Sequence, residues 1–179
     1  SRVATTEWIV ENIRGCDQPP RVFLSASGVG FYGDRGNEQL TEEDDGGKGF
    51  LADLCAQWEK VARVAESPAT RVCLLRFGVV LTREGGHLAT VTRTPLSPFA
   101  IFPSDGRQSL SWVHIVDLLR IIVLCLFDPR LKGPVNCTAP FSESARDFAK
   151  QLRSASGCRF LLKVPSVVLT AMLGQGREI

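Results

Sequence analysis

The stretch RVFLSASGVGFYGD, residues 21–34, changes from apolar residues to small hydroxylic ones and then to glycines. Its beginning, RVFLSA (21–26), has the length and composition of a buried strand. The stretch also carries Ser25, Ser27 and Tyr32, the chain's only tyrosine. We therefore predict a strand whose carboxyl end opens into a functional site.

Strand patterns alternate with helix patterns along the rest of the chain. Apolar residues at helical spacing predict helices, and short apolar runs bounded by turn residues predict strands. This alternation predicts an α/β fold with a parallel, doubly wound sheet covered on both faces. Ser144 and Asp147 predict a cap for the last of these helices, whereas residues 93–107, with their prolines, predict an irregular excursion. The expected helices cover residues 2–14, 50–66, 117–127 and 145–155, and the expected strands cover residues 21–26, 71–81, 133–139 and 159–164.

Composition narrows the classes of partner. The 179 residues suffice for one domain, and a net charge of +2 gives no reason to expect nucleic acid or an anionic membrane. The most apolar run, residues 118–127, is too short for a membrane span. Six dispersed cysteines show no metal-binding spacing and predict reduced thiols, hence a cytoplasmic protein, or an organellar one if a targeting peptide precedes the chain.

Parallel sheets bind ligands beyond the carboxyl ends of their strands. This rule places residues 25–32, 77–80 and 138–140 on one rim. The segment GVGFYG (28–33) is rich in glycine, but an acidic loop follows it rather than a helix. A phosphate-binding turn needs a helix there, so we do not expect residues 28–33 to bind a nucleotide phosphate.

Several segments together resemble a known family. FLSASGVGFYGD, FLADLCAQWEKVA, TRVCLLRFGVVLTREGG and GRQSLSWVHIVDLL occur in this order. They are similar to SulA-like or YfcH-like NAD-dependent epimerase family proteins, which are atypical extended short-chain dehydrogenase/reductases. The resemblance implies an NAD- or NADP-dependent oxidoreductase or epimerase acting on a sugar nucleotide or another small carbonyl compound.

The resemblance also implies a domain arrangement. Residues 1–140 would be the second half of a Rossmann-like domain, with a substrate-side excursion at 84–111, and residues 141–179 would begin a small C-terminal domain. The first half of the Rossmann domain, with its phosphate-binding loop, and the C-terminal end would then lie outside this chain.

The family pattern assigns roles to individual residues. Ser27 would orient the substrate oxygen, with Ser25 as the less favoured alternative, and Tyr32 would be either a substitute acid or part of the pocket wall. A serine at a strand end can also simply bond to its own backbone. Residues expected beside the nicotinamide are Ser25, Ala26, Arg76, Phe77, Gly78 and Val79, and those expected beside the substrate are Arg107 and Gln108.

Three further expectations concern chemistry. A buried Arg76 must find carboxylate or carbonyl partners, for which an acid of residues 42–45 is the candidate, and Gly78 would let a ring approach the backbone. Reductases of this class use a tyrosine and a lysine one helical turn apart, yet FLADLC (50–55) contains neither. The sequence therefore leaves open a catalytically silent NAD(P)-binding scaffold or sensor, or a fragment that binds no nucleotide.

Overall fold

A computed structural model describes residues 2–82, 84–85, 99–103, 106–156 and 160–164. The chain forms two compact units. Unit 1 comprises the residues up to Phe77 together with Val116–Cys137, and unit 2 comprises Gly78–Ile115 and the residues from Thr138 onward. We describe each unit by itself.

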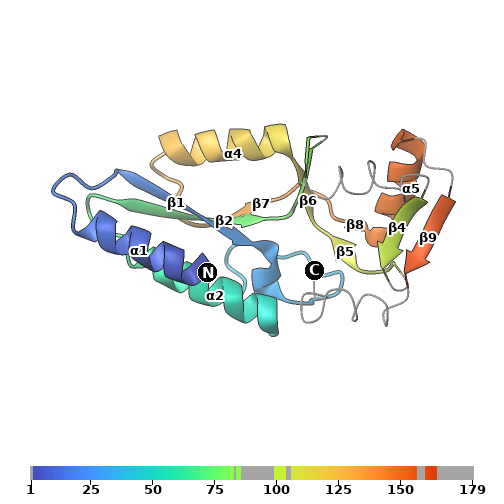
Figure 1. Ribbon diagram of the computed structural model, residues 1–179, viewed down its shortest axis with the longest axis horizontal. Helices are drawn as coiled ribbons and strands as arrows, with labels where there is room; N and C mark the ends of the chain where they lie inside the picture. The colour runs from blue at the N-terminus through green and yellow to red at the C-terminus, as the bar shows by residue number, and fades with distance from the viewer. Residues whose placement is uncertain (1, 83, 86–98, 104–105, 157–159, 165–179) are drawn as a thin grey trace. The chain divides into compact units, whose positions relative to one another are not determined.

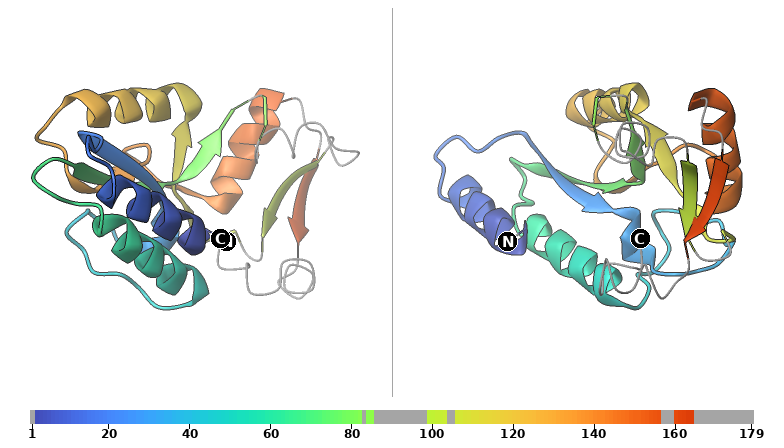
Figure 2. Two further views of the ribbon diagram at one scale, coloured as in Figure 1. Left: turned by 60° about the vertical axis from the view of Figure 1, so that its left-hand side comes forward. Right: turned by 45° about the vertical axis from the view of Figure 1, so that its right-hand side comes forward.

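Unit 1 is built on a parallel sheet with strand order β1-β2-β7. The strands are β1 (Val22–Gly28), β2 (Arg71–Phe77) and β7 (Gly133–Cys137). Helices α1 (Arg2–Arg14) and α2 (Phe50–Arg63) cover one face, and α4 (Ile115–Phe127) covers the other (Figures 1 and 2). The predicted α/β class with a parallel sheet is confirmed, and β1 and β2 run in the same direction, so their carboxyl ends share one edge.

The core of unit 1 lies between the sheet and the two helices on its first face. Val10 of α1 and Ala62 of α2 pack with Val72 and Leu74 of β2. Trp58 fastens α2 to α1, because its indole nitrogen donates a hydrogen bond of 2.7 Å to the Thr6 hydroxyl. The apolar residues at helical spacing in 2–14 and 50–66 therefore form the helix faces that pack against the sheet.

Arg71, at the start of β2, holds the C-terminal end of α4. Its Nη1 donates to the carbonyl oxygens of Cys125 at 2.9 Å and Leu131 at 2.5 Å. The last carbonyls of a helix have no partner within the helix, so a cation that reaches them stabilises its end.

We expect Arg71→Met to lower the free energy of unfolding by about 2 kcal/mol, because it removes charged hydrogen bonds to partly buried carbonyls. Chemical denaturation followed by circular dichroism would measure the change. Arg130→Met is the matched control, since Arg130 pairs with Asp128 at 2.7 Å near the same helix end but its side chain is exposed. An equal effect of the two substitutions would contradict the role given to Arg71.

The cysteines of the described residues are free thiols. Cys16 is exposed, whereas Cys55, Cys73, Cys125 and Cys137 are buried. Burial raises the pKa of Cys125 to about 11 and that of Cys137 to about 12. These side chains therefore act as small apolar groups of the core, as the sequence predicted.

The face of α4 that points away from the sheet is apolar. A groove of about 440 Å³ runs along this face. No described helix is long and apolar enough to cross a membrane. The apolar residues of this face, which are 44–80% exposed, are Val116, Leu119, Val123, Leu124 and Phe127.

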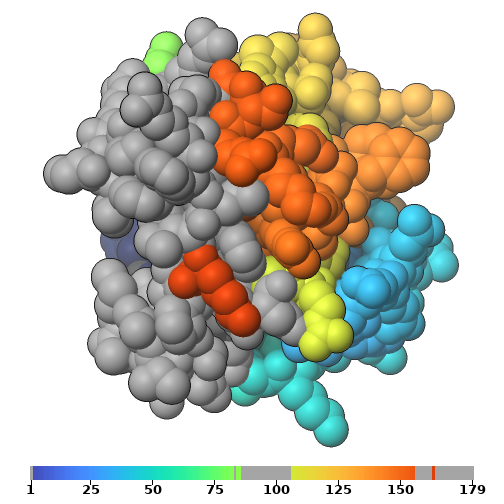
Figure 3. Space-filling view, turned by 90° about the vertical axis from the view of Figure 1, so that its right-hand side faces the viewer, coloured from blue at the N-terminus to red at the C-terminus, as the bar shows by residue number. Residues whose placement is uncertain are grey.

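The described residues of unit 2 form short strand pairs and a helix. The parallel pairs are β3 (Val79–Leu81) with β6 (Trp112–His114) and β4 (Phe99–Pro103) with β9 (Phe160–Val164). The strands β5 (Ser109–Leu110) and β8 (Glu143–Ser144) pair in antiparallel fashion, and α5 (Ala145–Ser156) follows β8. The orange atoms of α5 reach the surface on the face drawn in Figure 3.

Two sequence predictions need correction in unit 2. The single strand expected over 71–81 is two strands, because the chain changes sheet at Gly78, between β2 and β3. The excursion expected over 93–107 contains β4, whose pairing with β9 supplies the backbone partners that local sequence does not reveal. The cap predicted for the helix at 145 is confirmed, since the Asp147 N–H donates to the Ser144 hydroxyl at 3.0 Å.

Candidate functional site

The candidate site of unit 1 lies at the carboxyl edge of its sheet. Strand β1 ends at Gly28 and continues into the 3-10 helix η1 (Val29–Tyr32). Ser27 stands opposite Arg76 in the register of β1 and β2, and Arg76 stands opposite Asn136 in the register of β2 and β7. Parallel pairing therefore brings three polar residues to one level of the sheet, next to the carboxyl ends where ligands bind in such folds.

A chain of buried hydrogen bonds joins these strands to α2 and η1. The Ser27 hydroxyl donates to Glu59 Oε1 at 2.8 Å. Arg76 donates to both oxygens of Glu59, from Nε at 2.8 Å and from Nη2 at 2.9 Å. Its Nη1 donates to the Tyr32 phenol oxygen at 2.9 Å. All four residues are at most 5% exposed, so the groups depend on one another rather than on water.

The carboxylate partner of Arg76 is Glu59, which corrects the expectation of an acid from residues 42–45. Burial lowers the pKa of Arg76, but the hydrogen bonds to Glu59 and Tyr32 outweigh it and raise that pKa above its usual value. Glu59 belongs to the buried stripe of α2 together with Ala52, Cys55 and Ala62. A glutamate at a buried helical position was the sequence signal that could have identified the partner of Arg76.

The cation beside the Tyr32 phenol is Arg76, which is distant from it in sequence. Its phenol oxygen also lies 2.7 Å from Asn136 Oδ1 and 2.9 Å from the Thr41 carbonyl oxygen. A phenol carries one proton, so Tyr32 donates to only one of these two acceptors at a time. The Phe31 ring lies against the other side of the Arg76 guanidinium, 3.6 Å from ring centre to guanidinium carbon.

The acidic loop over residues 33–49 is packed tightly against η1. The Gly47 N–H donates to the Phe31 carbonyl at 2.9 Å. A Cβ at Gly47 would overlap the Tyr32 carbonyl, and a Cβ at Gly46 would lie 3.1 Å from the Phe31 ring. Glu42 of this loop accepts a 2.8 Å hydrogen bond from the Asn136 N–H. The loop therefore closes over Tyr32 and the end of β7.

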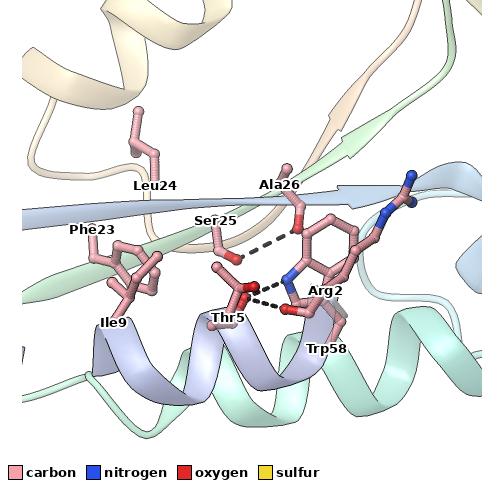
Figure 4. A pocket seen from close by; sticks show the side chains of 9 residues that line it. Arg2, Thr5, Ile9, Phe23, Leu24, Ser25, Ala26 and Trp58 are labelled. Carbon is pink, nitrogen blue, oxygen red and sulfur yellow. Dashed lines mark hydrogen bonds between the residues drawn. The ribbon is translucent and has the colours of Figure 1, made fainter. Parts of the chain in front are cut away.

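Ser25 and Ala26 line a groove of about 470 Å³ between β1 and α1 (Figure 4). Among the described strands, β1 pairs only with β2. Ser25 points toward α1 and its hydroxyl lies 3.4 Å from the Ala26 carbonyl oxygen. The remaining lining residues are Arg2, Thr5, Thr6, Ile9, Phe23, Leu24 and Trp58.

Gly78 does permit a close approach to its backbone, but in this structure the approaching group is protein. A Cβ at Gly78 would lie 2.7 Å from the Ser111 carbonyl oxygen. The same oxygen accepts a 2.8 Å hydrogen bond from the Val79 N–H. Glycine at 78 is therefore required for β3 to pair with β6 in unit 2, whereas Phe77 belongs to unit 1 as the last residue of β2.

Arg107 and Gln108 belong to a loop of unit 2 that is anchored at the start of α5. The Gln108 carbonyl accepts from the Ala145 N–H at 2.9 Å, and the Gly106 carbonyl accepts from the Arg146 N–H at 3.0 Å. Both residues are exposed. The backbone of this loop is therefore fixed at the start of α5.

Leu51 and Cys55 of α2 lie beside η1 and the last residue of β1. A Cβ at Gly30 would lie 3.3 Å from Leu51, and a Cβ at Gly28 would lie 3.9 Å from the Cys55 sulfur. Burial raises the pKa of Cys55. No described group of histidine, cysteine or acidic residues could hold a metal ion.

No protein-family model matches the chain. Comparisons with individual known proteins do find relatives, and the two described here share one family name. The Arabidopsis thaliana protein named epimerase family protein SDR39U1 homolog, chloroplastic, is 36% identical over 182 residues, covering 100% of this chain and 52% of its own length. Human epimerase family protein SDR39U1 is 33% identical over 184 residues, covering 100% of this chain and 61% of its own length. The chain thus spans 52% to 61% of the length of these relatives.

Solved structures give the same result. The crystal structure of human epimerase family protein SDR39U1 (isoform 2) with NADPH has a TM-score of 0.89 and 32% identity, covering 100% of this chain and 61% of that one. The nucleoside-diphosphate sugar epimerase of Corynebacterium glutamicum has a TM-score of 0.73 and 32% identity, covering 96% of this chain and 38% of that one. The chain therefore has the Rossmann-type fold of short-chain dehydrogenase/reductases.

Proposed function

We propose that the chain is part of an NAD(P)-dependent epimerase or oxidoreductase of the extended short-chain dehydrogenase/reductase type, of the SulA-like or YfcH-like family. The observation that carries this proposal is the match over the whole chain to a structure described with NADPH. NADP(H) or NAD(H) would be the cofactor, and a sugar nucleotide or another small carbonyl compound would be the substrate. When bound, the nicotinamide supplies hydride transfer at its C4 position.

The carboxyl end of β1 fits this cofactor better than the ends of β2 and β7 do. Ser25 and Ala26 near that end line a groove, whereas the 33–49 loop packs over Tyr32 and Asn136. Among the proposed cofactor residues, Arg76 would act indirectly, because its described hydrogen bonds are to Glu59 and Tyr32. Ser27 would bond to a reacting oxygen, and in unit 2 the exposed Arg107 and Gln108 would bind a charged part of the substrate.

A catalytically silent NAD(P)-binding scaffold or sensor is the second candidate. It is favoured by Leu51 and Cys55, which face the end of β1 and η1 where this class of enzyme needs an acid and a cation. Arg76 weakens this alternative, because it gives Tyr32 a cation from another element.

Titration with NADPH and NADH, followed by nicotinamide fluorescence, tests both candidates. We expect saturable binding. A panel of sugar nucleotides and small carbonyl compounds is then screened for a substrate. With that substrate, we expect Ser27→Ala to reduce turnover by about 100-fold. Nicotinamide affinity should change by no more than about five-fold, the effect of one hydrogen bond.

The outcomes separate the candidates. Binding without turnover of any compound supports the silent protein, and unchanged turnover in Ser27→Ala removes the role proposed for that serine. Absence of binding of either cofactor to the full-length protein overturns both candidates, whereas absence of binding to this chain alone supports a part that binds no nucleotide by itself.

A further inference from the structure

One ion pair connects the two candidate catalytic hydroxyls. Ser27 is on β1 and Tyr32 is on η1, and each is bonded to one member of the Glu59–Arg76 pair. We propose that Glu59 and Arg76 are positioning residues that set the direction of the hydrogen bonds made by Ser27 and Tyr32. This inference rests on the proposed function, because only that function makes the two hydroxyls part of a site.

Glu59 fixes the direction at Ser27. Its carboxylate is held by two N–H groups of Arg76 and can only accept, so the proton of the 2.8 Å bond belongs to Ser27. The Ser27 oxygen then has lone pairs left to accept a bond from a ligand but no proton to give. A ligand group at Ser27 is therefore a donor, such as a hydroxyl or a carboxamide N–H, and donation to a carbonyl would require Ser27 to leave Glu59.

Arg76 fixes the direction at Tyr32. Its Nη1 donates to the phenol oxygen, so the phenol proton must point elsewhere, to Asn136 or to the Thr41 carbonyl. The positive charge beside the oxygen and the Phe31 ring against the guanidinium restrict how Tyr32 can turn.

The planarity of the guanidinium couples the two ends. Nε and Nη2 meet the two oxygens of Glu59, which fixes the plane of Arg76 and aims Nη1 at Tyr32. Glu59 therefore acts on Tyr32 without touching it. A lysine at 76 could keep the charge but not this geometry.

The single tyrosine of the chain gives a direct test without cofactor. Tyrosine labelled with ¹³C at Cζ yields one NMR resonance, whose position depends on the hydrogen bonds of the phenol oxygen. We expect Glu59→Gln to move this resonance although residue 59 does not bond to Tyr32, and Arg76→Lys to move it further. Glu38→Gln, which breaks the exposed Arg35–Glu38 pair at 2.8 Å, is the matched control and should leave it in place.

A resonance at the wild-type position in folded Glu59→Gln would overturn the coupling. If Glu59→Gln does not give a folded amide spectrum, Ser27→Ala decides, since it removes a bond to Glu59 without touching Arg76 or Tyr32. An unmoved resonance in folded Ser27→Ala would then overturn the coupling.

A double-mutant cycle in NADPH affinity separates positioning from structural support. We expect Ser27→Ala and Glu59→Gln each to weaken binding about five-fold, and the double variant to be no weaker than either, because Glu59 acts through Ser27. Loss of about 25-fold in the double variant, as for independent effects, would contradict the positioning role. If the full-length wild-type protein binds no NADPH, the proposed function fails while the NMR measurement still decides the coupling.

Discussion

Arg76→Met is expected to lower the free energy of unfolding by about 3–5 kcal/mol, because it leaves the Glu59 carboxylate buried without its cation. Glu59 is 4% exposed and Arg76 is 2% exposed, so water cannot replace the lost partner without opening the core. Urea denaturation of the wild-type and variant chains, monitored by circular dichroism, measures the difference.

Replacing both members of the pair gives the sharper result. The double variant Glu59→Leu/Arg76→Met removes both charges, so we expect it to be more stable than Arg76→Met alone. It should remain less stable than the wild type, since Ser27 and Tyr32 each lose a hydrogen-bond partner. Arg35→Met, at the exposed pair with Glu38, serves as control and should cause no measurable change. The single variants Arg76→Met and Glu59→Leu each give a loss of unfolding free energy. If the loss in the double variant equals the sum of these two losses, Glu59 and Arg76 do not act as a pair.

Gly47→Ala is expected to destabilise the chain by about 3 kcal/mol, the upper end of the usual cost of overpacking. The added methyl group would overlap the Tyr32 carbonyl and would lie 2.8 Å from the Gly33 nitrogen, and backbone atoms cannot rotate away as a side chain can. The same denaturation experiment measures this loss.

Gly85→Ala is the matched control, because a Cβ at that position meets nothing within 4 Å. We expect it to leave the free energy of unfolding close to that of the wild type. If Gly47→Ala were as mild as Gly85→Ala, the 33–49 loop would not be packed against η1 in solution as the structure shows.

Local sequence patterns were sufficient for most of unit 1. The apolar run at 21–26 became β1, the helix spacing at 50–66 became α2, and parallel pairing of β1 with β2 followed from the alternation of strands and helices. These features could be predicted because each depends on the residues of one segment or on a general rule of connection. The break at Gly78 could not, because it depends on the distant backbone of Ser111.

The candidate site was predicted only in its parts. Ser27, Tyr32 and Arg76 were each singled out, but the sequence did not reveal that Glu59 joins them. The reason is physical: the partner of a buried charge is chosen by how α2 packs on the sheet, and 17 residues separate Glu59 from Arg76 along the chain. The burial of Glu59 among Ala52, Cys55 and Ala62 would have been the only local indication.

The tight fit of Gly46 and Gly47 against η1 limits how the 33–49 loop can vary in length. Both of its ends are held, Gly33 beside Lys48 at one end and Gly47 beside Phe31 at the other. Residues 34–39 are exposed, and exposed loop tips are where added residues are best tolerated. An epitope or a dye-bearing peptide inserted between Arg35 and Glu38 would therefore leave the sheet edge intact, and related chains of different length should differ there before they differ at the glycines.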